Sequence, residues 1–185
     1  MEKTRSGMNA GRGAGKDLYV IGGPMGVGKT TVCRQLQRLL DRSVFLDGDW
    51  CWDARPFQVT EETREMVLEN IAFLLNSFLR CSAYDHVIFC WVLHRAEIWE
   101  EVLRRLTEPY SLRAVSLICT PEALRSRLEG DIRAGRRTPD VLDRSLAYLP
   151  LYDALDTCRL DVSALTPRAA AEHILTAAGK EREPE

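Results

Sequence analysis

The sequence Gly23-Pro24-Met25-Gly26-Val27-Gly28-Lys29-Thr30 satisfies in full the pattern G-x-x-x-x-G-K-[S/T], the Walker A motif of phosphate-binding loops. The apolar run 18–21 before it predicts a short strand, and apolar residues recur after it at helical spacing. A strand, a glycine-rich loop and a helix in this order form the context in which the motif binds phosphate. Residues 23–30 are therefore predicted to hold a phosphate-bearing ligand.

The residue types in this loop suit the phosphates of a nucleotide. Its glycines let backbone N–H groups turn inward and form a nest for anions at the start of a helix. Lys29 can reach the β and γ phosphates, and the hydroxyl of Thr30 is placed to bind Mg²⁺. The residues expected to contact the nucleotide are Gly23, Gly26, Val27, Gly28, Lys29, Thr30 and Thr31.

Composition limits the other possibilities. The 185 residues are 45% hydrophobic, which suits one compact domain, and the net charge of −2 argues against binding to nucleic acid or an anionic membrane. No apolar run approaches the roughly 20 residues that span a bilayer. The six cysteines include no CxxC pair. We expect a cytoplasmic monomer or homodimer that acts on a small partner.

Strands and helices alternate along the chain. The segments predicted to be strands are 18–21, 43–46, 87–92, 114–119 and 159–162, and helices are predicted near 31–40, 66–79 and 98–106 and after Thr120 and Thr166. This order predicts an α/β fold, a three-layer α/β/α sandwich around a five-stranded parallel sheet. Residues 1–16 are expected to be a flexible leader, 17–179 the domain and 180–185 a disordered tail.

Acidic residues help to define the class of P-loop protein. The chain has no Asn-Lys-x-Asp sequence, which small GTPases use to select guanine, and runs 87–92 and 115–119 do not end in the acid typical of motor and helicase ATPases. The run 44–46 does end in acids, Asp47 and Asp49. At the carboxyl edge of a sheet, such carboxylates can hold Mg²⁺ through water and accept a proton from an attacking hydroxyl.

Four segments together resemble one known group. GPMGVGKT, LDGDW, RSRLEGDIRAGRRTPDVLDR at 125–144 and DVSALTP resemble the nucleoside-monophosphate-kinase-like P-loop kinases. Within that superfamily the chain is most similar to gluconate, shikimate and adenylylsulfate kinases, to chloramphenicol phosphotransferase and to bacterial nucleotide kinase-like proteins. The resemblance covers about 17–179. It implies a P-loop NTPase fold with a small helical lid, and transfer of the γ phosphate of ATP, with Mg²⁺, to a small-molecule or nucleotide acceptor.

The resemblance also implies roles for individual residues. Asp47 would help to hold Mg²⁺, and Asp49 would contact the acceptor or serve as the base. The lid would map to 127–140, where Arg127 would contact the nucleotide and Arg133 and Arg137 would act in catalysis. Each assignment has an ordinary alternative, because Asp-Gly-Asp is also a good turn and arginines among acids also form a solvated helix face.

Two further groups point to an acceptor site. Trp50, Cys51, Trp52, Asp53 and Arg55 follow the Asp-Gly-Asp turn, and His94 and Arg95 follow the run 87–92. Because loops at the carboxyl ends of strands line the ligand crevice of an open α/β sheet, we expect the two groups to face each other. Indole rings can stack on a flat ligand and arginines can clamp an anion. Alternatively, a tryptophan packs in the core and His94 only ends the strand.

The sequence therefore favours a kinase over two alternatives. One is a P-loop ATPase or nucleotide-binding switch without a small-molecule acceptor. The other is a kinase of the zeta-toxin type, which acts on nucleotide sugars.

Overall fold

One five-stranded sheet forms the centre of the molecule. In the computed structural model, which describes residues 15–180, all strands are parallel and lie in the order β2-β3-β1-β4-β5. The strands are β1 (Lys16–Gly22), β2 (Ser43–Asp47), β3 (His86–Cys90), β4 (Tyr110–Ile118) and β5 (Cys158–Asp161). The predicted five-stranded parallel sheet is confirmed.

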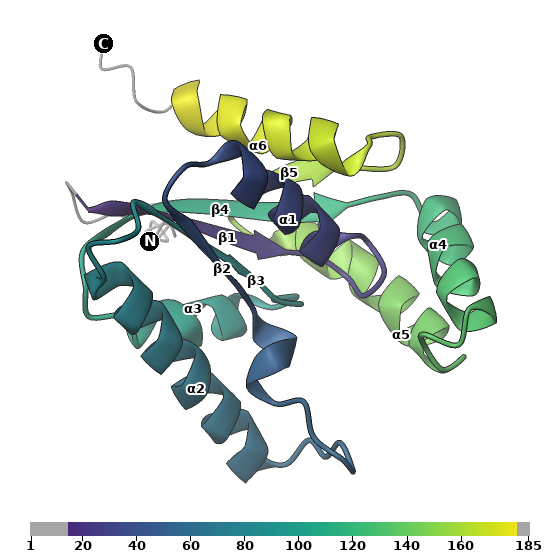
Figure 1. Cartoon of the computed structure of the whole chain (residues 1–185). Coiled ribbons are helices and arrows are strands. Elements are labelled where there is room, and N and C mark those ends of the chain that lie inside the picture. The colour runs from purple at the N-terminus through teal and green to yellow at the C-terminus, as the bar shows by residue number, and fades with distance from the viewer. Residues whose placement is uncertain (1–14, 181–185) are drawn as a thin grey trace, which may run out of the picture.

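Helices cover both faces of this sheet (Figure 1). The α-helices are α1 (Lys29–Leu39), α2 (Glu61–Arg80), α3 (Ala96–Arg104), α4 (Pro121–Arg133), α5 (Val141–Tyr148) and α6 (Pro167–Lys180), and the 3-10 helices are η1 (Gly48–Cys51) and η2 (Leu149–Ala154). α1 and α6 lie on one face and α2 and α3 on the other, so the predicted three layers are confirmed. α4 and α5 project beyond the sheet at the right of Figure 1.

The central strand β1 supplies both halves of the core. Tyr19 and Ile21 pack in the cluster shared with α1 and α6, whereas Leu18 and Val20 pack in the cluster shared with α2 and α3. All four side chains are buried. A strand covered on both faces has to be apolar throughout, which is why 18–21 is a continuous apolar run rather than an alternating one.

Helix starts follow the predicted signals. Thr60 caps α2 through a reciprocal pair of hydrogen bonds with Thr63, and the hydroxyl of Thr120 accepts the N–H of Ala123 at the start of α4. Such caps satisfy N–H groups that have no partner within the helix. Three short elements, η1, α5 and η2, were not predicted.

The amino end of the domain begins earlier than expected. The leader was predicted to reach residue 16, but Lys16 belongs to β1, where it pairs with Tyr110 of β4. Its ammonium group donates to the carbonyls of Phe78, at 3.2 Å, and Cys81. The rest of the expected leader, 1–14, and the tail residues 181–185 lie outside the described part of the chain. No helix among the described residues is long and apolar enough to cross a membrane.

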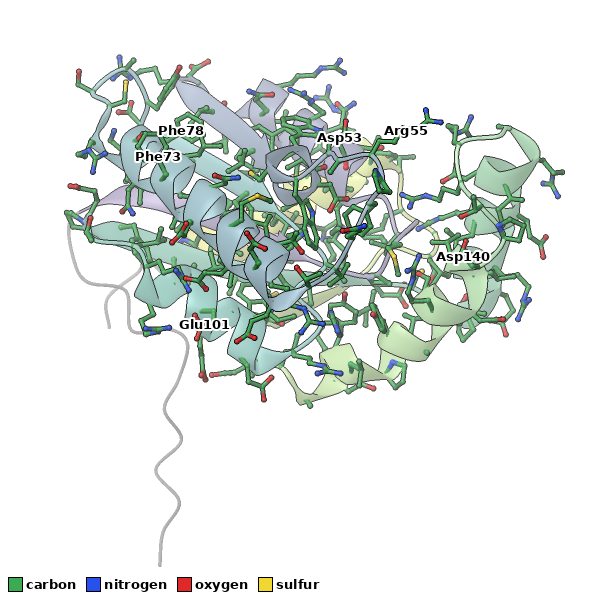
Figure 2. All side chains as sticks on the ribbon, turned by 90° about the horizontal axis from the view of Figure 1, so that it is seen from below. Asp53, Arg55, Phe73, Phe78, Glu101 and Asp140 are labelled. Atoms are coloured by element: carbon green, nitrogen blue, oxygen red, sulfur yellow. The ribbon has the colours of Figure 1, made fainter. Side chains whose placement is uncertain are left out.

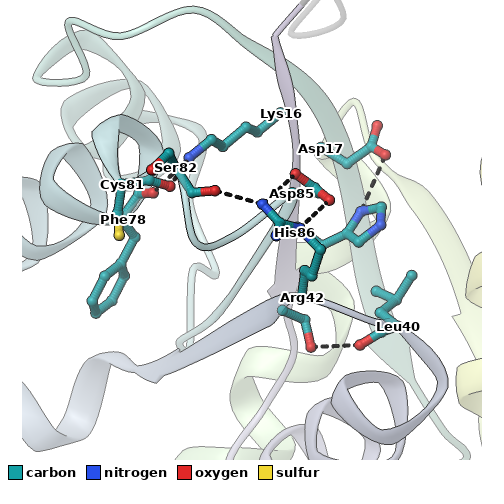
Figure 3. Close-up of polar contacts among 10 residues, drawn as sticks. Lys16, Asp17, Leu40, Arg42, Phe78, Cys81, Ser82, Asp85 and His86 are labelled. Atoms are coloured by element: carbon teal, nitrogen blue, oxygen red, sulfur yellow. Dashed lines mark hydrogen bonds and ion pairs between the residues drawn. The ribbon is translucent and has the colours of Figure 1, made fainter.

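Polar contacts tie the amino edge of the sheet (Figure 3). Arg42 pairs with Asp85 at 2.7 Å and also donates to the carbonyl of Ser82, and Nδ1 of His86 lies 3.3 Å from Asp17. These contacts link the turn before β2 to the turn before β3. The phosphate-binding loop follows β1 at the opposite edge, where the carboxyl ends of the strands meet.

Candidate active site

The Walker A loop has a backbone that only glycine adopts without strain. Gly26 and Gly28 have φ angles of 81° and 107°, in the left-handed region. A Cβ atom on Gly26 would also lie 2.4 Å from a methyl group of Leu128 in α4. Gly28 is the N-cap of α1, so the loop turns directly into the positive end of that helix. The sequence motif therefore has the local structure that it needs to bind phosphate.

Lys29 lies folded back across this loop. Its ammonium group donates to the carbonyls of Gly23, at 2.8 Å, and Pro24, at 3.0 Å. Burial lowers the pKa of Lys29, the positive charge of Arg137 lowers it further, and Cys90, Asp49 and Asp47 act in the opposite direction. An incompletely solvated cation attracts phosphate strongly, since it has less water to lose.

Thr30 and Asp47 come together beside the loop. The hydroxyl of Thr30 donates to Oδ2 of Asp47 at 2.6 Å, and Oδ1 of Asp47 accepts the N–H of Asp49 at 3.2 Å. Asp47 is only 6% exposed, at the end of β2 and opposite Cys90 of β3. A hydroxyl and a carboxylate are the oxygen ligands that Mg²⁺ prefers, so these two residues fit the metal.

The protein does not enclose a metal by itself. Among residues 15–180 no three His, Cys, Asp or Glu side chains are grouped closely enough to hold a metal ion. Mg²⁺ usually keeps several waters and binds through one or two protein groups together with substrate phosphates. A site of Thr30, Asp47 and nucleotide phosphates matches that mode.

Asp49 is held at the same edge by a residue that the sequence analysis did not assign to the site. Nε1–H of Trp91 donates to Oδ1 of Asp49 at 3.1 Å. Trp91 follows β3, where its N–H donates to the carbonyl of Ile21. A Cβ atom on Gly48 would lie 2.7 Å from Cγ of Trp91, so the glycine leaves room for the indole against the turn. The signal that could have found Trp91 was its place at the end of the strand next to β2.

The environment of Asp49 has opposing effects on its charge. Partial desolvation raises the pKa of Asp49, and the Asp47 carboxylate raises it further. Lys29, the hydrogen bond from Trp91 and the charge of Arg137 lower it. A carboxylate between a buried acid and a lysine has the surroundings expected of a general base.

The expected lid, 127–140, corresponds to the end of α4 and the turn before α5 (Figure 1). Arg136 and Arg137 in this turn both bond to Asp131, at distances of 2.8 to 3.4 Å. The positive charge of Arg137 lowers the pKa values of both Lys29 and Asp49. Arg133 is the exposed last residue of α4.

Arg127 lies under the loop rather than in the turn. Its guanidinium donates to the carbonyls of Val27, at 3.0 Å, and of Val162 and Ser163, at 2.6 and 3.3 Å. It thereby joins the Walker A loop to the loop after β5. From α5, the buried Ser145 donates to the carbonyl of Met25 at 2.6 Å. The base of the expected lid is therefore fixed to the phosphate loop.

The four other residues predicted to bind the acceptor, besides Asp49, lie in different surroundings. Trp50 packs edge-on against Phe45, and the guanidinium of Arg34 lies 5.2 Å from its ring, on the side of α1. The ring of His94 stacks on Tyr148 of α5 at 4.1 Å. Trp50 and His94 therefore pack against different helices.

The two predicted arginines lie at the surface. Arg55 is exposed in the loop after η1, where Figure 2 shows it near Asp53. Arg95 is the exposed N-cap residue of α3. Neither position tests their expected role as a clamp for an anionic group.

Two further aromatic rings extend from Trp91. The ring of Trp52 is 5.9 Å from that of Trp91, and the ring of Phe57 is 4.8 Å from that of Trp52, both in edge-to-face geometry. The hydroxyl of Tyr152 donates at 2.6 Å to the carbonyl of Val92, which also accepts the N–H of Gly23. This shared carbonyl joins η2 and the segment after β3 to the start of the phosphate loop.

Comparison with protein families matches residues 20–142 to a family described as AAA domain. The chain belongs to this AAA-domain family. The matched region contains the Walker A loop, Asp47, Asp49 and the expected lid. A search of curated proteins found no significant match.

Solved structures share the fold of this AAA-domain protein. The tunicamycin resistance protein of Deinococcus radiodurans has a TM-score of 0.67 at 18% identity, over 89% of this chain and 96% of that one. A gluconokinase from Sinorhizobium meliloti has a TM-score of 0.61 at 18% identity, over 89% and 95%. A shikimate kinase from Acinetobacter baumannii has a TM-score of 0.59 at 22% identity, over 91% and 96%. The chain therefore shares the fold of these proteins, as the sequence resemblance implied.

Proposed function

We propose that this protein is a kinase that transfers the γ phosphate of ATP to a hydroxyl of a small-molecule or nucleotide acceptor, using Mg²⁺. The observation that carries the proposal is the position of Asp49, whose carboxylate interacts electrostatically with Lys29 and is bonded to Trp91. A nucleotide switch or simple ATPase has no need of a base for an acceptor, whereas a kinase does.

Each group would have a defined task. Backbone N–H groups of residues 23–28 and the ammonium of Lys29 would bind the β and γ phosphates. Mg²⁺, held by Thr30 and Asp47 together with the phosphates, would neutralise charge on the transferred group. Asp49 would accept the proton of the acceptor hydroxyl as its oxygen bonds to the γ phosphorus and the bond from phosphorus to the oxygen of ADP breaks.

Arg137 would contribute when the turn before α5 approaches the nucleotide. Its charge already acts on Lys29 and Asp49. A guanidinium at the transferred phosphate stabilises the charge of the transition state and helps to exclude water. Because Arg127 and Ser145 fix the base of this region, the movement would be confined to the turn 134–140.

The relatives favour this function without naming the acceptor. Two proteins with this fold carry the names gluconokinase and shikimate kinase, and the latter was solved with shikimate. Both names imply phosphate transfer to a hydroxyl compound. At 18% and 22% identity they support the reaction class rather than a particular substrate.

The test is ATP consumption with and without pools of small metabolites. A kinase should hydrolyse ATP slowly alone and should consume it at least ~10²-fold faster with one pool, giving a phosphorylated product detectable by mass spectrometry. Lys29→Met should abolish both rates without changing the melting temperature. Rapid ATP hydrolysis that no acceptor accelerates would favour a switch or ATPase. Stimulation by nucleotide sugars alone, with growth arrest on expression, would favour a zeta-toxin type kinase.

A further inference from the structure

A continuous series of aromatic rings leads away from Asp49. Trp91 bonds to the Asp49 carboxylate, Trp52 packs edge-on against Trp91, and Phe57 packs edge-on against Trp52. Trp91 and Trp52 are half-buried, whereas Phe57 is 57% exposed. The series therefore begins at the proposed base and ends in solvent. We refer to Trp91, Trp52 and Phe57 as the aromatic wall.

The wall is anchored from both sides. Gly48 admits the indole of Trp91 against the Asp-Gly-Asp turn, since any Cβ there would overlap the ring. On the other side, the amide of Asn70 in α2 donates to the carbonyl of Cys51 at 3.0 Å, directly before Trp52. A preformed wall binds a ligand with less loss of conformational entropy than side chains that must be ordered first.

We propose that the aromatic wall is the acceptor subsite, and that the acceptor is a hydroxyl compound carrying a planar ring, either a nucleobase or an aryl group. This inference rests on the proposed function, because it places the acceptor hydroxyl at Asp49. A ring on the wall would bring a neighbouring hydroxyl to the carboxylate. The three side chains carry no charge, and Trp91 lies against the carboxylate of Asp49, so a neutral ring suits this surface better than an acid sugar.

The four tryptophans provide a direct readout in the ¹⁵N-labelled protein. Trp91 and Trp52 belong to the wall, whereas Trp50 packs beside Arg34 and Trp99 is fully buried, with its N–H bonded to the carbonyl of Leu93. Their indole N–H signals in NMR spectra therefore separate binding at the wall from binding elsewhere. The titrations are made with saturating Mg·ADP. The nucleotide site is then filled, so the probe can bind only on the acceptor side.

Two matched pairs of probes isolate the ring. Uridine is compared with methyl β-D-ribofuranoside, and 3-phenoxypropane-1,2-diol with glycerol, so that each pair differs chiefly in the planar group. The ring-bearing member of at least one pair should shift the Trp91 and Trp52 signals and leave those of Trp50 and Trp99 in place. The pair that responds distinguishes a nucleobase from an aryl group.

Substitution at the exposed end completes the test. Phe57→Ala should weaken binding of the responding probe on the order of 10-fold, as expected for loss of one stacking ring. Phe73→Ala is the matched control, because Phe73 lies on α2 and is 70% exposed. Figure 2 shows it well apart from Asp53 and Arg55, which shortly precede Phe57 in the sequence. Equal binding of both members of each pair, no response of Trp91 and Trp52 to either ring, or unchanged affinity in Phe57→Ala would overturn the inference.

The outcome of these titrations is independent of whether the protein is a kinase. These titrations measure binding and need no turnover. A protein that binds a ring at the wall but transfers no phosphate from ATP would retain the subsite and lose the kinase assignment. Phosphorylation of a ring-free compound with Phe57→Ala fully active would retain the kinase and remove the subsite.

Discussion

The hydroxyl of Thr30 lies 2.6 Å from the carboxylate of Asp47, although the two residues are 17 positions apart in the chain. The contact joins the first turn of α1 to the end of β2. It brings together the two residues proposed to hold Mg²⁺, next to Asp49, the proposed base.

Substitutions of the two acids should separate their roles. Asp49→Asn should lower kcat by ~10² or more with little change in the affinity for ATP, because it removes the base and leaves the phosphate loop intact. Asp47→Asn should instead raise the Mg²⁺ concentration needed for half-maximal rate. Steady-state kinetics over a Mg²⁺ series measures both effects. The same response in both variants would contradict the division of roles.

Trp91→Phe should reduce turnover more than acceptor binding. Phenylalanine keeps a ring in the aromatic wall but cannot donate to Asp49, so the carboxylate loses the bond that orients it. We expect kcat to fall roughly 3- to 10-fold, since one hydrogen bond to a charged group is involved, while KM for the acceptor changes less. Trp50→Phe is the control, because Trp50 packs on the side of α1. Equal losses in both variants would indicate a structural role only.

The arginines of the turn before α5 should differ in effect. Arg137→Ala should lower kcat by more than it raises KM for ATP, because the charge of Arg137 acts on Lys29 and Asp49. Arg136→Ala should have a small effect, since exposed ion pairs such as that with Asp131 contribute about 1 kcal/mol or less. Arg133→Ala was predicted from the sequence to resemble Arg137→Ala. Hydrogen exchange of 127–140 should slow when ATP and acceptor bind together, and unchanged exchange and rates would exclude a lid.

Arg127→Ala should destabilise the protein. The half-buried guanidinium donates to three backbone carbonyls from two loops, and alanine would leave them without these donors. The free energy of unfolding should fall by about 1.5 to 3 kcal/mol, measured by urea denaturation. The exposed Arg125 on the same helix provides the control, Arg125→Ala. A nucleotide contact alone would instead raise KM for ATP at unchanged stability.

His94 should make stability depend on pH. Burial and then the charge of Arg95 lower the pKa of His94, and its buried Nδ1 has no hydrogen-bond partner among the described residues. The unfolded chain therefore takes up the proton more readily than the folded one, so the stabilising contribution is complete above pH ~6.5 and is lost as the pH falls below it. His94→Phe keeps a ring on Tyr148 but does not titrate. Its melting temperature should fall less than that of the wild type between about pH 7.5 and 5.5.

The parts of the fold that depend on local sequence could be predicted. The Walker A loop needs glycines at fixed positions, and the caps Thr60 and Thr120 satisfy N–H groups three residues away, so both can be read from a short window. The apolar run 18–21 also indicated a strand covered on both faces. The loop and the helix start that position Lys29 and Thr30 could therefore be predicted from the sequence.

Contacts between residues on neighbouring strands could not be predicted from a short window of sequence. Trp91 meets Asp49 because Asp47 pairs with Cys90, and this register is a property of the assembled sheet. Trp50 and Trp52 are two residues apart, yet η1 directs the first toward Arg34 and brings the second to Trp91. The bonds of Arg127 to carbonyls were also missed, since a guanidinium donates equally well to phosphate and to backbone oxygen.

The position of β2 gives the domain a mechanical property. β2 is an outer strand, paired on one side only, with β3, and its last residue is the acid proposed to meet Mg²⁺. Fraying of this strand would withdraw Asp47 from Thr30 without disturbing the centre of the sheet. Occupancy of the nucleotide site should therefore stabilise this outer strand, and slower amide exchange at 43–46 would report that Asp47 is held in place beside Thr30.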